Sequence, residues 1–405
     1  MSNSDVQNEA RTETAGTTGE VFRVFLKLGL TSFGGPIAHL GYFRDALVVR
    51  HRWLDEKAYA DLVALCQFLP GPASSQVGFA LGFLRAGPMG AAAAWAAFTL
   101  PSALLLFAFA LFAGALDNPL GEGLLHGLKI VAVAVVSQAV WGMARSLCPD
   151  RERAGIALAA LVLVTLAASA FAQIVAILCG ALLGWRMCRN KVGEAGKTVA
   201  FGLSKRTGIV SLSLFALLLL GLPLADQMMQ GLAVFDTFYR AGALVFGGGH
   251  VVLPLLEAGV VEPGWVSRDA FLAGYGAAQA VPGPLFTFAS YLGAVLDSPP
   301  TGSAGAMIAL FAIFLPGFLL LMGVAPFWDR FRQIDAARAA MMGTNAAVVG
   351  ILAAALYDPL WTTAILSPAD FALATVCFLL LTVWKAPPWM AVVLCALAGM
   401  GFAIL

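Results

Sequence analysis

The chain has 405 residues, of which 60% are hydrophobic and only 12% are charged. Soluble globular domains carry roughly 25% charged residues, so this composition excludes an ordinary soluble enzyme, a nucleic-acid-binding protein and a disordered chain. The net charge is only +1, and runs such as residues 91–112 are long enough to cross a bilayer. The sequence therefore predicts an all-α, polytopic helical membrane protein.

The chain begins with a polar segment, residues 1–20, that lacks an apolar core. This composition favours a short disordered tail and not a cleavable signal peptide. The six cysteines lie in apolar surroundings without a CxxC pattern, and we interpret them as small packing residues. No metal site and no cofactor is expected.

The next apolar segment, residues 22–43, is interrupted by Gly34-Gly35-Pro36. Two apolar segments of 12 residues follow, 58–69 and 73–84, on either side of Pro70-Gly71-Pro72. A 12-residue helix is about 18 Å long, whereas the hydrocarbon core of a bilayer is about 30 Å thick. Neither short segment can span alone, so the pair is predicted to be a re-entrant helical hairpin that turns at the two prolines.

The chain contains an internal repeat. Phe33-Gly34-Gly35 recurs as Phe246-Gly247-Gly248, and Pro70-Gly71-Pro72 recurs as Pro282-Gly283-Pro284, at offsets of 213 and 212. Further pairs follow in the same order, so a duplication explains the matches better than coincidence in a glycine-rich chain. We predict a first copy over 21–186, a second over 235–405, and between them a linker with one inverting helix over 187–234.

The loop charges predict how the two copies are inserted. Loop 44–57 is basic, and its counterpart 257–269 is mainly acidic; three further pairs of loops show the same reversal. Because basic loops stay in the cytoplasm, the copies should have opposite orientations, as an inverted-topology repeat. The linker 186–206 holds six basic residues and is predicted to be cytoplasmic. Nine full spans are expected, near 89–115, 124–145, 154–171, 173–186, 208–224, 304–327, 338–356, 370–384 and 388–405.

The helix breaks suggest a site for an anion. Helices that restart at membrane depth expose backbone N–H groups, and a helix N-terminus acts like about half a positive charge. Ser74, Ser75 and Thr287 follow the two turns and could add hydroxyl donors. The predicted substrate-binding residues are Lys27, Gly34, Gly35, Gln67, Pro70, Gly71, Pro72, Ser74, Ser75, Arg240, Gly247, Gly248, His250, Gln279, Pro282, Gly283, Pro284 and Thr287.

Several of these residues allow a second interpretation. Lys27 and Arg240 are aligned at an offset of 213; they either face the substrate or extend to a membrane interface. Gln67 and Gln279 either bind substrate or cap the broken hairpin backbone. His39 is interpreted as a packing or interfacial residue. Asp61 and Glu257 are the carboxylates nearest to the breaks, and neither indicates a proton relay.

The motifs resemble those of the chromate ion transporter family in its long, two-domain form. They are Phe33–His39 and Phe68–Pro72 in the first copy, and Phe246–Pro254 and Gln279–Thr287 in the second. The resemblance covers residues 20–405 and implies a carrier of the bacterial inner membrane that expels chromate with the proton-motive force and confers chromate resistance. Shorter relatives with one such copy act in pairs, which fits an inverted repeat.

The functional hypothesis is thus a secondary transporter, not an enzyme, whose partners are chromate, protons and the lipid bilayer, with a homodimer left open. Sulfate is nearly isosteric with chromate, so a sulfate or other oxyanion carrier, or a channel of the same fold, is the main alternative. A membrane-embedded, lipid-modifying enzyme using His250 and Glu257 is a weaker one. Nucleotide-binding and hydrolase motifs are missing from the sequence.

Overall fold

The computed structural model describes residues 16–33, 35–113, 118–167, 170–189, 202–225, 229–246, 249–331 and 334–403. These residues form helices joined by short turns, and no strand occurs among them. The prediction of an all-α protein is confirmed. Gly34, Gly247, Gly248, residues 1–15 of the tail and residues 190–201 of the linker lie outside the described residues.

Among the described residues, the first half of the chain contains seven α-helices and one π-helix. Its elements are α2 (Thr18–Thr31), α3 (Gly35–Phe43), the π-helix η1 (Arg44–Arg50), α4 (Glu56–Phe68), α5 (Ala73–Ala113), α6 (Pro119–Leu147), α7 (Arg151–Ala167) and α8 (Ala170–Met187).

The second half repeats this order after one additional helix, α9 (Lys205–Ala225). The repeated elements are α10 (Gln230–Ala243), η5 (Gly249–Val251), α11 (Val252–Leu256), the π-helix η6 (Glu257–Val261), α12 (Arg268–Ala280), η7 (Leu285–Thr287), α13 (Phe288–Ala294), α14 (Gly302–Val324), η8 (Ala325–Phe327), α15 (Trp328–Phe331), α16 (Asp335–Ala355), η9 (Leu356–Trp361), α17 (Thr362–Ala364), α18 (Pro368–Thr382) and α19 (Pro388–Phe402).

Matching helices start at matching capping residues. The Asp55 carboxylate accepts a hydrogen bond from Ala58 N at 2.8 Å at the start of α4. The hydroxyl of Ser267, which is 212 residues later, accepts from Ala270 N at 3.2 Å at the start of α12. Asp and Ser are strong N-cap residues because their side chains satisfy an N–H group that has no partner within the helix.

The helices on either side of each Pro-Gly-Pro turn contact each other, α4 with α5 and α12 with α13, and a second reversal of the chain follows in each copy. After the first Pro-Gly-Pro turn, α5 runs to Ala86 and Gly87, where the helix is interrupted and the chain reverses. The returning part packs so closely that Gly90 leaves no room for a Cβ at Gly82. In the second half, Gly293 of α13 packs in the same way against Gly305 of α14. Each copy therefore holds a short helix that turns back before the long apolar helix begins.

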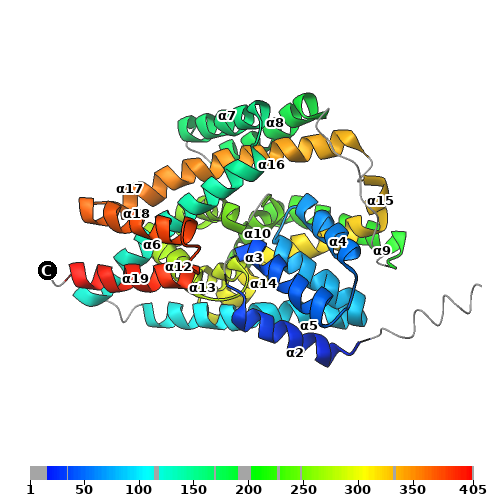
Figure 1. The fold of residues 1–405 in the computed structure, drawn as a ribbon, viewed down its shortest axis with the longest axis horizontal. Coiled ribbons are helices and arrows are strands. Elements are labelled where there is room, and N and C mark those ends of the chain that lie inside the picture. Colours follow the sequence, from blue (N-terminus) through cyan, green and yellow to red (C-terminus); the bar gives the residue numbers. More distant parts are fainter. Residues whose placement is uncertain are drawn as a thin grey trace, which may run out of the picture.

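The copies exchange their last two helices. α6 packs against α18 and α19 of the second half, and α16, the counterpart of α6, packs against α7 and α8 of the first half. Figure 1 shows the green α7 and α8 beside the orange α16, and the red α19 beside the teal α6. Glycines make these contacts close: Gly127 and Gly123 meet Gly399 of α19, and Gly343 meets Gly184 of α8.

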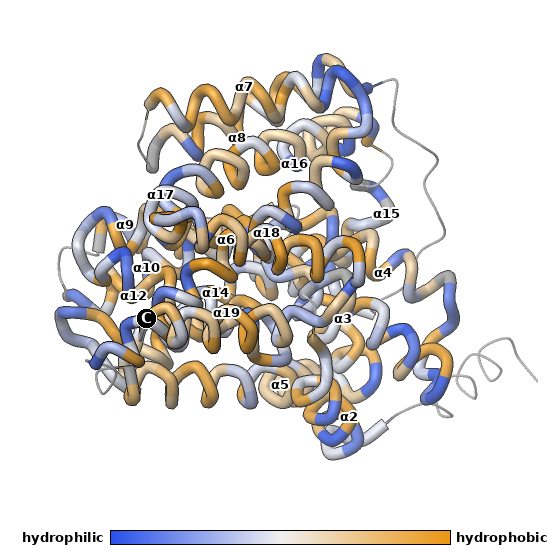
Figure 2. The backbone as a smooth tube through the Cα atoms, turned by 60° about the vertical axis from the view of Figure 1, so that its left-hand side comes forward, coloured by the Kyte–Doolittle hydropathy of each residue, from blue (hydrophilic) through white to orange (hydrophobic). Residues whose placement is uncertain are grey.

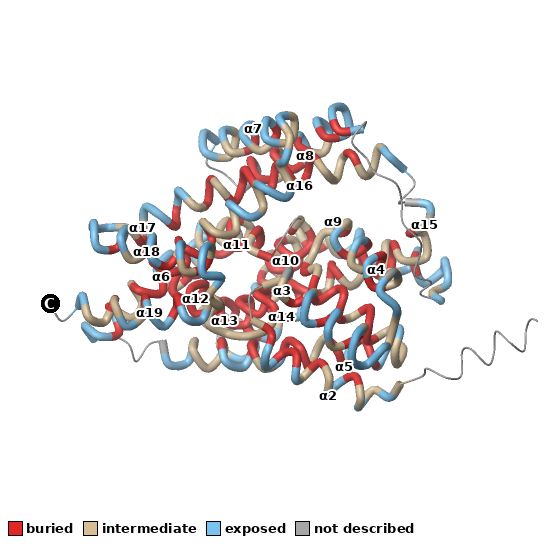
Figure 3. The backbone as a smooth tube through the Cα atoms, in the orientation of Figure 1, coloured by how far each residue is buried: buried red, intermediate tan, exposed pale blue. Residues whose placement is uncertain are grey.

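Five helices are long and apolar enough to cross a membrane within the described part of the chain. They are Ala73–Phe112, Pro119–Leu147, Lys205–Leu224, Gly302–Phe327 and Asp335–Ala364. Figure 2 shows hydrophobic colouring along α5 and α7, and Figure 3 shows that α12, α13 and α14 form the buried centre while α7 is largely exposed. This pattern of long apolar helices is typical of a multi-pass membrane protein.

The boundaries differ from the predictions in small ways. The polar tail expected to reach residue 20 ends earlier, because Thr17 caps α2 and the helix begins at Thr18. Four of the nine expected spans, α7, α8, α18 and α19, have 15 to 18 residues. Helices of this length are roughly 23–27 Å long, slightly less than the hydrocarbon core. They are arranged as two hairpins, one from each copy.

Candidate functional site

The two Pro-Gly-Pro turns are each held by the opposite copy. Gly71 N donates a hydrogen bond to Val245 O at 2.7 Å, and Gly283 N donates to Ser32 O at 2.9 Å. Val245 and Ser32 are aligned residues, each just after the first helix of its copy. Gly71 and Gly283 have φ values of +117° and +104°, which side chains with a Cβ rarely adopt. Each turn therefore satisfies a backbone carbonyl exposed by the helix break of the other copy.

The breaks and the turns meet at one place. A Cβ on Gly71 would lie 3.0 Å from Gly317 Cα of α14, and a Cβ on Gly283 would lie 2.9 Å from Ser102 Oγ of α5. Ser102 and Gly317 each follow an intrahelical proline of the long apolar helix. Gly249, at the second break, lies against Pro36 at the first, since its Cβ would be 3.3 Å from Pro36 Cγ. Four interruptions of helical backbone thus converge in the protein interior.

Polar side chains of the first copy line this convergence. His39 Nδ1 lies 3.3 Å from Ser74 Oγ, and the His39 ring packs edge-on against Phe98 with centroids 5.3 Å apart. His39 and Ser74 are buried, as is Ser32 beside the second turn. The buried positions bring a ring nitrogen and hydroxyl groups to the N-terminus of α5.

Several of these atoms have no hydrogen-bond partner among the described residues. They are Ser32 Oγ, His39 Nε2, Ser75 Oγ, Gln76 Oε1 and Thr99 Oγ1. Leaving a buried polar atom unpaired costs roughly 1–3 kcal/mol, and such groups commonly mark a functional site. Gln76 Oε1 can only accept a hydrogen bond, whereas the three hydroxyl groups and the imidazole can donate one. Ser32, His39, Ser75 and Thr99 therefore form the α5 donor cluster, which can solvate a small anion.

The backbone at the N-terminus of α5 also offers hydrogen-bond donors to an anion. Its first intrahelical bond runs from Gln76 N to Pro72 O at 2.9 Å, so the N–H groups of Ala73, Ser74 and Ser75 precede the hydrogen-bonded turns. The Gln76 side chain anchors this end, because Nε2 donates to Pro70 O at 3.0 Å and to Gly317 O at 2.9 Å. The anchored N-terminus directs a partial positive charge of about half a unit at the convergence.

The second copy does not offer the same free donors. Thr287 Oγ1 donates to Pro284 O at 2.7 Å, and Ser290 Oγ donates to Ala103 O at 3.2 Å. His250 Nδ1 and Tyr275 OH are 2.6 Å apart, and Gln279 Nε2 donates to Tyr275 O at 3.4 Å. The predicted residues Thr287, His250 and Gln279 lie near the second turn, but Thr287 Oγ1, His250 Nδ1 and Gln279 Nε2 already have partners within the protein.

Three predicted residues are not brought into the cluster. Lys27 of α2 and Gln67 of α4 are exposed. Arg240 of α10 is 39% exposed, and its guanidinium is paired with Asp236, with 2.8 Å between Nη2 and Oδ2. Asp236 is only 7% exposed, so the positive charge of Arg240 balances a buried carboxylate. A role for these residues in substrate binding stays a prediction.

His39, Ser32 and Thr99 were not predicted as site residues. His39 was interpreted as a packing residue, although it lies four residues after Gly35 in the first motif. That spacing places His39 one helical turn after the break, on the side of Ser74. Ser32 and Thr99 carried no comparable signal, because isolated hydroxyl residues are common in membrane helices.

Ion pairs near the ends of the hairpins show the symmetry of the copies. Arg44 of η1 pairs with Glu56 of α4 through Nε and Oε1 at 2.5 Å. The aligned residues are Glu257 and Arg268, which pair at 3.4 Å with the signs exchanged. The hydrogen bond to the Glu56 carboxylate raises the pKa of the exposed Arg44 guanidinium. The two pairs occupy equivalent positions, but the basic and the acidic residue are exchanged between the copies. The reversed charges of the loops predict this exchange.

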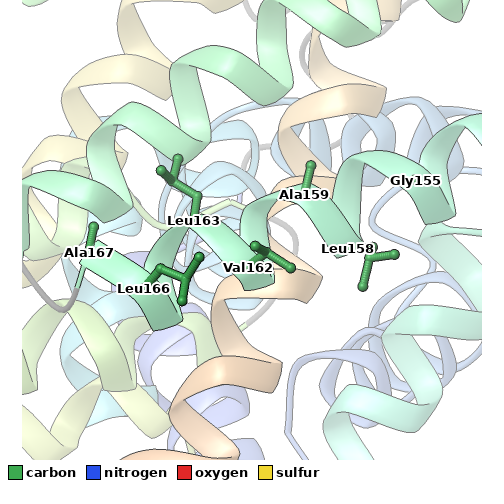
Figure 4. Close-up of a pocket in the computed structure, with 7 residues that line it drawn as sticks. All are labelled: Gly155, Leu158, Ala159, Val162, Leu163, Leu166 and Ala167. Atoms are coloured by element: carbon green, nitrogen blue, oxygen red, sulfur yellow. The ribbon is translucent and has the colours of Figure 1, made fainter.

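A groove of about 630 Å³ on the outside of the protein is separate from this site. Figure 4 shows that its labelled side chains come from the single helix α7, among them Leu158, Val162 and Leu166. The lining is apolar and exposed. An exposed apolar helix face of this kind suits contact with lipid chains and offers nothing to hold an anion.

A family profile described as "Chromate transporter" matches the chain twice, over residues 19–185 and 232–400. The chain belongs to the chromate transporter family. The two matched ranges contain the two Pro-Gly-Pro turns and the α5 donor cluster. Membership makes the protein a transporter and not an enzyme.

Relatives match most of the chain. A chromate transport protein of Cupriavidus metallidurans is 28% identical over 348 residues, which cover 84% of this chain and 82% of the relative. A chromate transport protein of Pseudomonas aeruginosa is 28% identical over 366 residues, 85% of this chain and 82% of the relative. An uncharacterised transporter of Methanocaldococcus jannaschii is 26% identical over 317 residues, 77% of each chain. No solved structure matches the chain significantly.

Proposed function

We propose that the protein is a secondary transporter that exports chromate across the bacterial inner membrane with the proton-motive force and so lowers cytoplasmic chromate. The α5 donor cluster is the observation that supports this proposal best. Chromate is a tetrahedral divalent oxyanion, and it requires several hydrogen-bond donors once it leaves water. Unpartnered hydroxyl groups, an imidazole and a helix N-terminus provide such donors in the buried centre of the protein.

The substrate lies, in this proposal, against the N-terminus of α5, with Ser75, His39 and Ser32 as side-chain ligands. The family relation favours chromate, because two relatives matched over most of their length are named chromate transport proteins. Sulfate has the same charge and geometry, and the cluster contains no feature that would exclude it. Sulfate is therefore the competitor to test.

The orientation follows from charge. The basic loop 44–57 and the basic linker 186–206 are proposed to be cytoplasmic, and the acidic loop 257–269 periplasmic. The exchanged signs of the Arg44–Glu56 and Glu257–Arg268 pairs support opposite insertion of the two copies. The Pro-Gly-Pro hairpin of the first copy then enters from the cytoplasm, and that of the second from the periplasm.

Chromate uptake into everted membrane vesicles tests the function. Uptake should saturate with chromate concentration, should fall to the level of vesicles without the protein when an uncoupler is added, and should decrease with excess sulfate if both anions share the site. Uptake that is linear in concentration and insensitive to the uncoupler would instead identify a channel. Uptake of sulfate without uptake of chromate would assign the protein to the alternative substrate.

A further inference from the structure

The two copies differ in how their hairpins pack against the long helices α6 and α16. These long helices themselves pack in equivalent ways in the two copies. Gly343 is 216 residues after Gly127, and the two glycines make equivalent contacts with α8 and α19. This register pairs Leu128 with Thr344 and Lys129 with Asn345 on α6 and α16. In the hairpins, equivalent residues of the two copies are 212 positions apart, as Gly71 and Gly283 show. Ala64 therefore corresponds to Gly276.

The hairpin of the second copy is packed against the long helices beside it. α12 contacts both α6 and α19. Gly276 lies so close to Leu128 O that no Cβ fits between them, and Leu272, one turn earlier, is buried. At the outer end of this contact, Lys129 Nζ donates to Asp269 Oδ1 at 2.6 Å. This arrangement closes the space between α12 and α6.

The equivalent contact is missing in the first copy. α4 packs against α5 and η1, and within the described part of the chain it makes no comparable contact with α16 or α8. Figures 1 and 3 show α4 apart from α16, whereas α12 lies beside α6 and α19. Ala60 and Ala64 of α4 are exposed, although their counterparts Leu272 and Gly276 are buried.

The position on α16 that corresponds to Lys129 carries a buried acceptor. Asn345 Oδ1 has no hydrogen-bond partner among the residues that the structure describes. Asn345 is the counterpart of Lys129, and Lys57, the second residue of α4, is the counterpart of Asp269. The sequence therefore has a lysine on the hairpin and an asparagine on the long helix where the second copy has Asp269 and Lys129.

We propose that the Lys129–Asp269 pair latches the state described here, and that the opposite state packs α4 on α16 with Ala64 against Thr344 and Lys57 donating to Asn345 Oδ1. The inference rests on the proposed function, because it gives the two states that alternating access of the α5 donor cluster requires. With the proposed orientation, the contact between α12 and α6 lies toward the periplasm and is made in the described state, whereas the corresponding contact between α4 and α16 lies toward the cytoplasm and is not made. An exporter without bound substrate would receive cytoplasmic anion in this state.

The two latches differ in strength. A hydrogen bond between an ammonium and a carboxylate is stronger than one between an ammonium and a neutral amide. The described state is therefore the resting state, and substrate binding must favour the opposite state by its differential affinity. Neutralising Asp269 weakens only the first latch, so it should move the equilibrium toward the contact between α4 and α16.

Disulfide cross-linking in membranes tests this proposal without any anion. Two variants carry cysteine pairs, Lys129→Cys with Asp269→Cys, and Ala64→Cys with Thr344→Cys, each with its single-cysteine variants as controls for the six native cysteines. A protease site inserted in the linker between the copies shows whether the halves remain joined under non-reducing conditions. The first pair should cross-link at least tenfold faster than the second.

Adding Asp269→Asn to the Ala64→Cys/Thr344→Cys variant should then increase its cross-linking rate severalfold. Glu262→Gln, which removes an exposed carboxylate from the same loop, is the matched control and should leave the rate unchanged. The proposal is overturned if Ala64→Cys and Thr344→Cys never cross-link, or if Asp269→Asn has no more effect than Glu262→Gln. Absence of chromate uptake together with the expected cross-linking would reject the proposed substrate while leaving the two states in place.

Discussion

The two hairpins have the same backbone design and different polar side chains. Both turn at Pro-Gly-Pro, and both donate a glycine N–H to a carbonyl of the opposite copy. In the first copy, Ser75 Oγ and His39 Nε2 near the turn have no partner among the described residues. In the second, Thr287 and Ser290 are bonded to backbone carbonyls. The comparison shows that the two copies share the framework, whereas polar side chains are left without a partner in one copy and are bonded to backbone in the other.

Substitution of the turn glycines should have the largest effect, and in both copies alike. Gly71→Ala and Gly283→Ala place a side chain at φ values of +117° and +104°, with close contacts to Gly317 and Ser102. We expect chromate uptake to fall more than 100-fold, because the strain of roughly 1–3 kcal/mol adds to the displaced turn. Gly142→Ala, in an open position on α6, is the control. An effect in only one copy would contradict the equivalence of the turns.

Removal of Arg240 should affect stability more than removal of its counterpart Lys27. Arg240→Ala leaves the Asp236 carboxylate, which is 7% exposed, without its partner. A hydrogen bond to a charged group contributes about 1.5–3 kcal/mol, so a thermal unfolding assay in detergent should show a decrease of several degrees. Lys27→Ala, at an exposed position, should leave the transition within one degree. Its effect on chromate uptake then isolates any electrostatic role of Lys27 in transport.

The donor difference between the copies predicts a difference in transport kinetics. Ser75→Ala should raise the KM for chromate about tenfold, which corresponds to about 1.4 kcal/mol, because a donor to the anion is lost. Ser290→Ala removes a bond to Ala103 O and should leave KM within twofold. His39→Gln should behave like Ser75→Ala, and His51→Gln, at an exposed position, is its control. Equal shifts for Ser75→Ala and Ser290→Ala would place the substrate between the copies.

The smallest effect is expected at the ion pairs outside the hairpins. Glu56→Gln removes the partner of Arg44, whose side chain is 47% exposed, and Arg268→Gln removes the partner of Glu257. Exposed ion pairs contribute little to stability because water screens them, so Glu56→Gln should lower the unfolding temperature by about a degree or less. Because Glu257 is less exposed than Arg44, Arg268→Gln should have the larger effect of the two. A larger decrease for Glu56→Gln than for Arg268→Gln would show that the burial of the remaining partner does not determine the loss of stability.

Local features of the chain were largely predictable. The short apolar segments on either side of Pro70–Pro72 could not span a membrane, and the structure folds them as a hairpin. The break before Gly35 and the extra helix α9 were also indicated by proline, glycine and length. These features depend on local conformational limits, which proline and glycine determine directly.

The packing partners were not predictable in the same way. Lys27 and Gln67 were expected near the substrate because they align with Arg240 and Gln279, yet both are exposed. Alignment of a residue with its counterpart does not determine which neighbour covers it, and α4 and α12 have different neighbours. His39 was missed for the converse reason, since its burial against Phe98 and Ser74 depends on contacts across tens of residues.

The exchange of the last two helices has a consequence for biosynthesis. The helix that carries Gly180 and Gly184 is translated some 160 residues before Gly343 of α16, the surface against which it packs. At 5–20 residues per second, the ribosome needs on the order of ten seconds to supply that surface. During this interval the glycine face of α8 must be shielded by lipid or by the insertion machinery, so assembly of the first half is completed only when the second half arrives.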